Sequence, residues 1–196
     1  NDDVADLALG LLLSVARKIP AADRFTRNAD WLDGPFQLTR KLTGAKLGIV
    51  GMGRIGQAIA KRAAAFDMVI SYTTRNERSD VPYKYVPNVL ALAADCDFMV
   101  VITPGGAATK NLINAEAIAA MKTGVRIVCA ARGGVIDEAA LLAGLNSGKV
   151  AAAGLDVFTA EPPGATELVL HPRTVCVPHI GAQTVEAQAR AADDIA

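Results

Sequence analysis

The segment from Lys46 to Gly56, KLGIVGMGRIG, most constrains what this chain can fold into. Residues 47–50 are apolar and uncharged, which is typical of a strand buried on both faces of a parallel sheet. Gly51, Gly53 and Gly56 follow with G-x-G-x-x-G spacing, and the residues after them repeat at helical spacing. A strand, a glycine turn and a helix in this order predict a dinucleotide site, because the glycines permit a tight turn and close approach to a pyrophosphate. The alternative is a plain turn between core elements.

Strand-like and helix-like segments alternate along the rest of the chain. Strands are expected at 47–50, 68–72, 98–102, 126–130, 150–157 and 174–177, and helices at 1–17, 20–31, 55–66, 88–94, 114–121, 137–147 and 185–196. This alternation predicts an α/β fold with a doubly wound parallel sheet. At 196 residues the chain fits a single domain with a substantial core. The charged segment 73–87 is expected to be a loop.

The charge balance excludes several classes of partner. Lysines and arginines equal the acidic residues at 20 each, and no basic stripe stands out, so neither nucleic acid nor an anionic membrane is an expected partner. The apolar run 7–16 is too short to span a bilayer and lacks the features of a secretory signal, so a cytoplasmic protein is expected. The three cysteines are far apart and form no C-x-x-C pair, and no metal site is expected.

The end of the second expected strand bears on which dinucleotide binds. NAD sites place an acid there for the ribose hydroxyls, whereas an arginine accommodates a 2′-phosphate. Here the strand leads into Thr73, Thr74 and Arg75, with Arg78 close behind and no carboxylate at the tip. Hydroxyl and guanidinium groups can donate to a phosphate, so NADP is expected, with NAD as the alternative. A solvated turn is the other interpretation of these residues.

Polar residues follow three later strands, where the ligand edge of a parallel sheet lies. They are Arg132, Asp156 with Glu161, and His179. Reduction of a 2-keto acid requires a cation for the carboxylate, a proton donor for the oxygen and an acid that orients the donor. Arg132, His179 and Glu161 are candidates for these three roles. Taken singly, each has a plainer interpretation: a helix-capping arginine, a turn histidine and a loop carboxylate.

Four motifs together resemble those of the D-isomer-specific 2-hydroxyacid dehydrogenases. They are LTGAKLGIVGMGRIG (42–56), ARGGVIDEAAL (131–141), GLDVFTAEP (154–162) and PHIGA (178–182), in the family's order. The resemblance implies that Arg132 binds the substrate, Glu161 pairs with the histidine and His179 is the acid/base. The cofactor residues expected from the glycine turn and the tip of the second strand are Gly51, Gly53, Gly56, Thr73, Thr74 and Arg75. The resemblance adds Arg54, Ile55, Thr103, Ala130, Ala131, Arg132, Asp156, His179, Gly181 and Ala182.

The two halves of the chain resemble different branches of this family. Residues 38–110 are similar to glyoxylate/hydroxypyruvate reductases, which often use NADPH, whereas the sequence from Lys122 onward looks more like D-3-phosphoglycerate dehydrogenase. Thr74 is at the position where NAD users of the family have an acid, which favours NADP over NAD. The expected substrate is a small 2-keto or D-2-hydroxy acid. The alternative function is a nucleotide-sensing interaction module, similar to the dehydrogenase-like co-repressors.

Family members also have a substrate domain, which this chain is expected to lack. We expect residues 1–196 to form a dinucleotide-binding domain alone, with weak or no turnover of its own. Its expected parts are linking and dimerisation helices at 1–35, a Rossmann-type core at 36–184 and the start of a return helix at 185–196. The leucine-rich first helix favours a homodimer through this domain.

Overall fold

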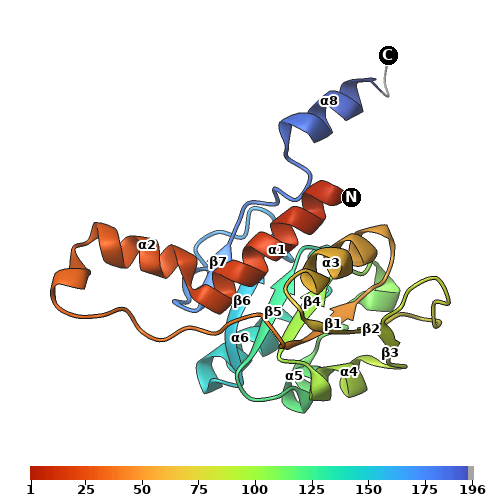
Figure 1. Cartoon of the computed structure of the whole chain (residues 1–196), viewed down its shortest axis with the longest axis horizontal. Helices are drawn as coiled ribbons and strands as arrows, with labels where there is room; N and C mark the ends of the chain where they lie inside the picture. The colour runs from red at the N-terminus through yellow and green to blue at the C-terminus, as the bar shows by residue number, and fades with distance from the viewer. Residues whose placement is uncertain (194–196) are drawn as a thin grey trace.

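A seven-stranded parallel sheet forms the centre of the computed structural model (Figure 1). The structure describes residues 1–193, with side chains through residue 189, so the last three residues of the helix expected at 185–196 lie outside it. The strands are β1 Lys46–Val50, β2 Val69–Thr73, β3 Lys84–Tyr85, β4 Phe98–Val101, β5 Val125–Cys129, β6 Val150–Leu155 and β7 Thr174–Cys176. The helices are α1 Asp2–Arg17, α2 Ile19–Arg27, α3 Arg54–Ala64, α4 Val89–Asp95, α5 Ala115–Ala120, α6 Glu138–Ser147, α7 Glu167–Leu170 and α8 Val185–Asp193, with short 3-10 turns η1 Asp30–Leu32 and η2 Ala107–Thr109.

The strand order β3-β2-β1-β4-β5-β6-β7 confirms the predicted doubly wound sheet. The order reverses between β1 and β4, which pair directly in parallel. In open α/β sheets, ligands bind in the crevice outside the carboxyl ends of the strands at such a reversal. The fold therefore places the glycine turn after β1 at the position where a ligand crevice is expected.

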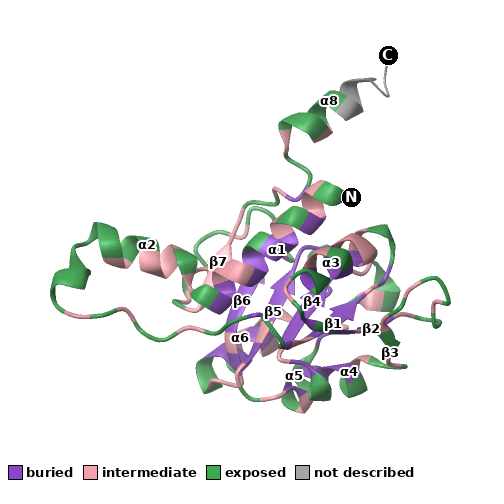
Figure 2. Ribbon diagram, in the orientation of Figure 1, coloured by how far each residue is buried: buried purple, intermediate pink, exposed green. Residues whose placement is uncertain are grey.

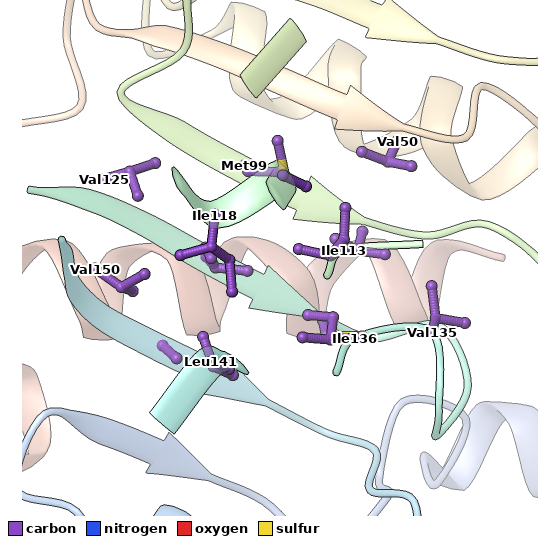
Figure 3. Packing of buried hydrophobic residues seen from close by; sticks show 14 of the residues in the cluster. Val50, Met99, Ile113, Ile118, Val125, Val135, Ile136, Leu141 and Val150 are labelled. Atoms are coloured by element: carbon purple, nitrogen blue, oxygen red, sulfur yellow. The ribbon is translucent and has the colours of Figure 1, made fainter. Parts of the chain in front are cut away.

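Helices cover both faces of the sheet and bury its apolar strands (Figure 2). On one face α1 and α3 pack together over the sheet, with Leu12 and Ile59 fully buried. On the other face α4, α5 and α6 pack through a cluster that includes Met99, Ile118 and Leu141 (Figure 3). Burial on both faces is why the strands are continuous apolar runs rather than alternating ones.

Side-chain caps fix where several helices begin. Asn88 accepts from the N–H of Ala91 at the start of α4, and Asn114, the expected cap, accepts from the N–H of Ala117 at the start of α5. Asp137 likewise caps α6. Each cap satisfies an N–H group that a helix leaves without an internal partner. These caps also fix where the loops at the carboxyl edge of the sheet end.

Several short elements, η2 among them, were not expected from the sequence; one strand ends early, and the second expected helix ends at Arg27 and is followed by the separate turn η1. The segment expected as a loop at 73–87 contains β3, whose pairing with β2 brings the Tyr72 and Tyr85 rings to 5.6 Å between centroids. The four-residue α7 was also missed, and β6 ends at Leu155 rather than at residue 157. Elements of two to four residues carry too little periodicity to stand out in a sequence.

An arm made of α2, η1 and the segment that follows extends away from the sheet (Figure 1). Helix α2 has no buried residue. Large apolar side chains on the arm are open to solvent: Trp31 is 67% exposed, Leu32 89% and Leu38 97%. This surface has no covering element among the described residues. No helix of residues 1–193 is both long and apolar enough to span a bilayer.

Candidate functional site

A cleft of about 960 Å³ opens at the carboxyl ends of β1, β2 and β4. It lies at the reversal of strand order, where the fold predicts a ligand crevice. Among the residues expected to bind the cofactor, its lining includes Gly51, Gly53, Arg54, Ile55, Gly56, Thr73, Thr74, Arg75 and Thr103. The structure thus brings together on one surface residues that are up to 52 positions apart, from Gly51 to Thr103.

The three glycines of the turn meet different physical demands. Gly51 has a φ of +106°, and a Cβ on it would lie 3.0 Å from the backbone of Ile102 and Thr103. A Cβ on Gly56 would lie 2.1 Å from the carbonyl oxygen of Gly51. By contrast, a Cβ on Gly53 would meet nothing within 4 Å. The chain's own packing therefore requires the outer two glycines, and the middle one leaves open space in which a diphosphate fits.

The start of α3 offers this open space a set of free donors. The helix begins at Arg54, and its N-cap Gly53 makes no side-chain cap. The first turn holds no acidic side chain, and the first helical bond to the turn runs from the N–H of Gln57 to the carbonyl of Gly53 at 2.9 Å. Such a terminus has unpaired N–H groups and a positive dipole end, which suit a diphosphate. These residues fit the pyrophosphate of a dinucleotide.

A second cleft of about 710 Å³ continues the first toward β5, β6 and the segment after β7. The two clefts share Ile55, Ile102, Thr103 and Pro104, so they form one continuous groove. Its lining includes the other expected cofactor residues Ala130, Ala131, Arg132, Asp156, His179, Gly181 and Ala182. A continuous groove made of two clefts matches the two halves of a dinucleotide.

Asp156 lines the second cleft and holds the backbone of the segment after β7. Its side chain is buried, and its carboxylate accepts from the N–H of Ile180 at 2.7 Å and of Gly181 at 3.0 Å. Burial raises the pKa of this carboxyl, although the two N–H donors and His179 oppose the shift. Asp156 thus fixes the backbone that follows His179. Each carboxylate oxygen of Asp156 accepts one backbone hydrogen bond. This structural role was not predicted from the sequence.

His179 and Glu161 form a pair at the rim of the second cleft. The Nδ1 atom of His179 lies 2.7 Å from Oε2 of Glu161, and Oε1 of Glu161 accepts from the N–H of Phe158 at 2.9 Å. Both donors lower the pKa of Glu161, with the His179 bond as the largest cause. His179 has a φ of +51°, a left-handed conformation that a side chain rarely adopts. Glu161 lines neither cleft, and its hydrogen bond to a groove residue is the one to His179.

Arg132 lines the second cleft together with His179, and its charge also acts on Glu161. Its side chain is exposed, and Nη1 donates to the carbonyl of Ala131 at 2.7 Å. A Cβ on Gly105 would lie 2.9 Å from the Cβ of Arg132, so the loop after β4 can approach only because position 105 is a glycine. Arg132, His179 and the carboxyl ends of β5 and β6 therefore face a common space. The groups expected to act on a 2-keto acid all lie at one end of the groove.

The two arginines that follow β2, both expected near a 2′-phosphate, differ in their contacts. Arg75 is exposed, lines the first cleft and makes no ion pair within 4 Å in the described part of the chain. Arg78 instead pairs with Asp80 through bonds of 2.9 and 2.5 Å and does not line the cleft. The Thr74 hydroxyl donates to the carbonyl of Asn76 at 2.6 Å. Of these two arginines, Arg75 is the one whose guanidinium makes no ion pair with a described residue.

Sequence reasoning missed the far wall of the first cleft. Pro87, Leu90 and Leu112 give it an apolar surface, and the capping residues Asn88 and Asn114 also line it. Asn114 was expected only as a helix cap. These residues follow β3 and η2 in the chain. Their place in loops beside the reversal of strand order could have revealed them, because such loops border the crevice. Val4 of α1, in the second cleft, was also missed.

The glycine turn, the strand order and the groove together define a Rossmann-type domain. The family model for the D-isomer specific 2-hydroxyacid dehydrogenase, NAD binding domain, matches residues 9–181. The chain belongs to this family, through its NAD binding domain. The predicted resemblance is therefore confirmed.

The alignments to several relatives extend over almost the whole chain. Glyoxylate/hydroxypyruvate reductase A of Arabidopsis thaliana is 41% identical over 193 residues, which are 98% of this chain and 62% of that protein. D-3-phosphoglycerate dehydrogenase of Rattus norvegicus is 42% identical over 98% of this chain and 36% of its own length. The crystal structure of an NADPH-dependent glyoxylate/hydroxypyruvate reductase from Sinorhizobium meliloti, in complex with NADP and malonate, has a TM-score of 0.92 at 36% identity, covering 98% of this chain and 61% of that one. The chain thus spans about three fifths or less of the length of these relatives.

Proposed function

We propose that this chain is the cofactor-binding part of an oxidoreductase that moves a hydride between NAD(P)H and a 2-keto or D-2-hydroxy acid. The observation that carries the proposal is the 2.7 Å pair of His179 and Glu161 at one end of a groove whose other end is the open glycine turn. Reductases of glyoxylate and hydroxypyruvate among the relatives support this substrate class. The nicotinamide ring would supply or accept the hydride.

The groove residues divide into those that would hold the cofactor and those that would act on the substrate. The free N–H groups at Arg54 and Ile55 would bind the pyrophosphate, and the backbone at Ala130, Ala131, Gly181 and Ala182 would border the nicotinamide. The forked guanidinium of Arg132 suits a carboxylate. His179 Nε2 would give its proton to the keto oxygen during reduction and take it back during oxidation.

Glu161 would act on the reaction through His179. Its lowered pKa keeps it ionised, so it accepts a hydrogen bond from Nδ1 and stabilises the protonated imidazole. Because Nδ1 is engaged by Glu161, Nε2 would be the nitrogen that exchanges a proton with the substrate. Glu161 is therefore a positioning residue in this proposal, and the proton moves at His179.

For the cofactor, we infer a preference for NADP over NAD. Arg75 is a cation without an ion-pair partner in the described chain, and Thr73 and Thr74 stand beside it at the tip of β2. The residues at the tip of β2 that line the cleft, Thr73, Thr74, Arg75 and Asn76, include no carboxylate, and the acidic lining residue of this cleft is Glu116, which precedes β5. The S. meliloti reductase, which is described as NADPH-dependent, supports this choice.

The proposed chemistry is tested by replacing His179 with glutamine. We expect turnover of hydroxypyruvate or glyoxylate with NADPH to fall by about 10²-fold or more, with cofactor affinity unchanged. Turnover is measured on the chain itself and in a chimera in which it replaces the matching domain of the Arabidopsis reductase. Equal rates for the chimera and its H179Q variant would refute the acid/base role. A matched control is His171→Gln, because His171 lies outside both clefts.

We further propose that the chain forms a homodimer through α1 and the arm, as the expected linking and dimerisation segment 1–35 implies. Trp31, Leu32 and Leu38 are the exposed apolar residues that a second copy would cover. Sedimentation of wild type and of a Trp31→Ser, Leu32→Ser double variant tests this. We expect a dimer that the variant weakens. A wild type that stays monomeric at high concentration would contradict the proposal.

A further inference from the structure

A basic cavity lies at the opposite edge of the sheet from the groove. It has a volume of about 280 Å³ and is lined by Arg40, Asp97, Lys122, Thr123, Gly124 and Arg126, together with Val125 and Ala151. These residues precede β1, β4 and β5 or lie at the start of β5 and β6, so they are at the amino ends of the strands. None of them lines either cleft of the groove. The cavity is therefore separate from the proposed catalytic site.

The lining carries more positive than negative charge. Asp97 is its only acidic residue, and its carboxylate accepts from the backbone N–H of Lys46 at 2.9 Å and from Nζ of Lys122 at 3.3 Å. Lys122 is thereby neutralised within the chain. Arg40 and Arg126 have no ion-pair partner within 4 Å among residues 1–189, whose side chains the structure describes. The three cations that line the cavity, Arg40, Lys122 and Arg126, exceed its one carboxylate by two charges.

Arg126 is held in place but is incompletely hydrogen-bonded. Its guanidinium carbon lies 5.7 Å from the centre of the Phe98 ring, and Nη1 donates to the carbonyl of Gly124 at 3.2 Å. Its Nε is shielded from solvent and has no hydrogen-bond partner in the described structure. Burial and the nearby charge of Arg40 lower the pKa of Arg126. Asp97, the one acid that lines the cavity, attracts Arg40, and the lining keeps a net excess of two positive charges, which a bound anion would compensate.

We propose that this cavity binds a phosphate group, either as inorganic phosphate or on a small phosphorylated metabolite. A doubly charged oxyanion would balance Arg40 and Arg126, and guanidinium forks bind such oxyanions through paired hydrogen bonds. At about 280 Å³ the cavity has room for a phosphate on a short carbon chain, whereas the groove clefts of about 960 and 710 Å³ suit a dinucleotide. This inference does not depend on the proposed function of the groove.

The test follows the backbone amide signals of Thr123 and Gly124 by NMR while inorganic phosphate, glycerol 3-phosphate or sodium chloride is added to the chain at constant ionic strength. The readout is local to the cavity, so phosphate bound at the glycine turn does not interfere. We expect saturable shifts with the phosphates and none with chloride. Tighter binding of glycerol 3-phosphate would identify an organic phosphate as the ligand, and equal binding would identify the free ion.

The variant for this test is Arg40→Gln, because Arg40 is exposed and its loss leaves the core intact. We expect it to weaken phosphate binding about tenfold, as loss of a charged hydrogen bond does. The matched control is Arg24→Gln, an exposed arginine on α2 outside the cavity, which should bind as wild type does. Unsaturable shifts, or equal affinities for both variants, would overturn the proposal.

Discussion

The Nδ1 atom of His179 lies 2.7 Å from Oε2 of Glu161, although the two residues are 18 positions apart in the chain. The other oxygen of Glu161 is bound to the N–H of Phe158, so the carboxylate is fixed to the backbone on one side and to the imidazole on the other. This arrangement makes the orientation of His179 depend on Glu161.

Replacing Glu161 with glutamine should therefore impair catalysis without impairing cofactor binding. The amide cannot stabilise a protonated imidazole as a carboxylate does, and we expect turnover to fall on the order of 10²-fold. The Kd for NADPH should stay within about twofold of wild type, because Glu161 lines neither cleft. Steady-state kinetics of the chimera and fluorescence titration measure the two effects. A loss of cofactor affinity equal to the loss of turnover would contradict this role.

The same pair should make stability depend on pH. The pKa of Glu161 is lowered from 4.5 in the folded chain, so its ionised form stabilises the fold above that pH, and the contribution is lost as the pH falls through the lowered pKa. The free energy of unfolding of wild type should exceed that of Glu161→Gln near neutral pH, and the difference should shrink in acid. Denaturant unfolding at several pH values measures this. A difference that does not change with pH would count against the pair.

Gly53→Ala separates cofactor binding from folding. A Cβ at this position meets nothing within 4 Å, and φ is −72°, so the free energy of unfolding should stay within about 1 kcal/mol of wild type. The added methyl occupies the space left for a diphosphate, so we expect cofactor affinity to drop by about tenfold or more. Thermal unfolding and calorimetry measure the two quantities.

Gly56→Ala is the matched control for that variant. Its Cβ would lie 2.1 Å from the carbonyl oxygen of Gly51, so the backbone must shift and the fold should lose stability. If Gly53→Ala bound NADPH as wild type does, the diphosphate would have to lie elsewhere.

Arg75 and Arg78 should differ in their effect on cofactor choice. Arg75→Ala removes the free cation at the tip of β2, and we expect it to weaken NADPH binding about tenfold while NADH binding is unchanged. Arg78→Ala breaks only the exposed pair with Asp80 and should alter neither affinity. Titration of each variant with both cofactors gives the ratio. Tighter NADH than NADPH binding in wild type would show that the preference for NADP is wrong.

Much of the fold could be predicted from the sequence because its signals are local. The apolar run before Gly51, the spacing of the glycines and the cap at Asn114 each involve neighbours in the chain, and the structure confirms the strand, the turn and the cap. By contrast, β3 exists because Tyr85 pairs with Tyr72, and this contact between distant residues leaves no periodic pattern. Tertiary pairing decides such short elements.

The sequence was enough to predict which residues lie at the site. It was not enough to predict which other groups their side chains contact. Residues that follow strands were expected at one edge of the sheet, and Arg132, Asp156 and His179 do lie there. Whether a side chain is free or already paired depends on packing in three dimensions. Arg78, which is bound to Asp80, and Asp156, which is bound to two backbone N–H groups, are examples that spacing alone could not distinguish from Arg75 and Arg132.

The most direct test of this account is calorimetry of the folded chain with NADPH and with NADH. The open turn at Gly53 and the uncapped start of α3 predict saturable heat with at least one cofactor, tighter for NADPH, and much weaker binding by Gly53→Ala. Absence of heat with both cofactors at several temperatures, on a chain that circular dichroism shows to be folded, would contradict the central claim that a dinucleotide binds across this groove.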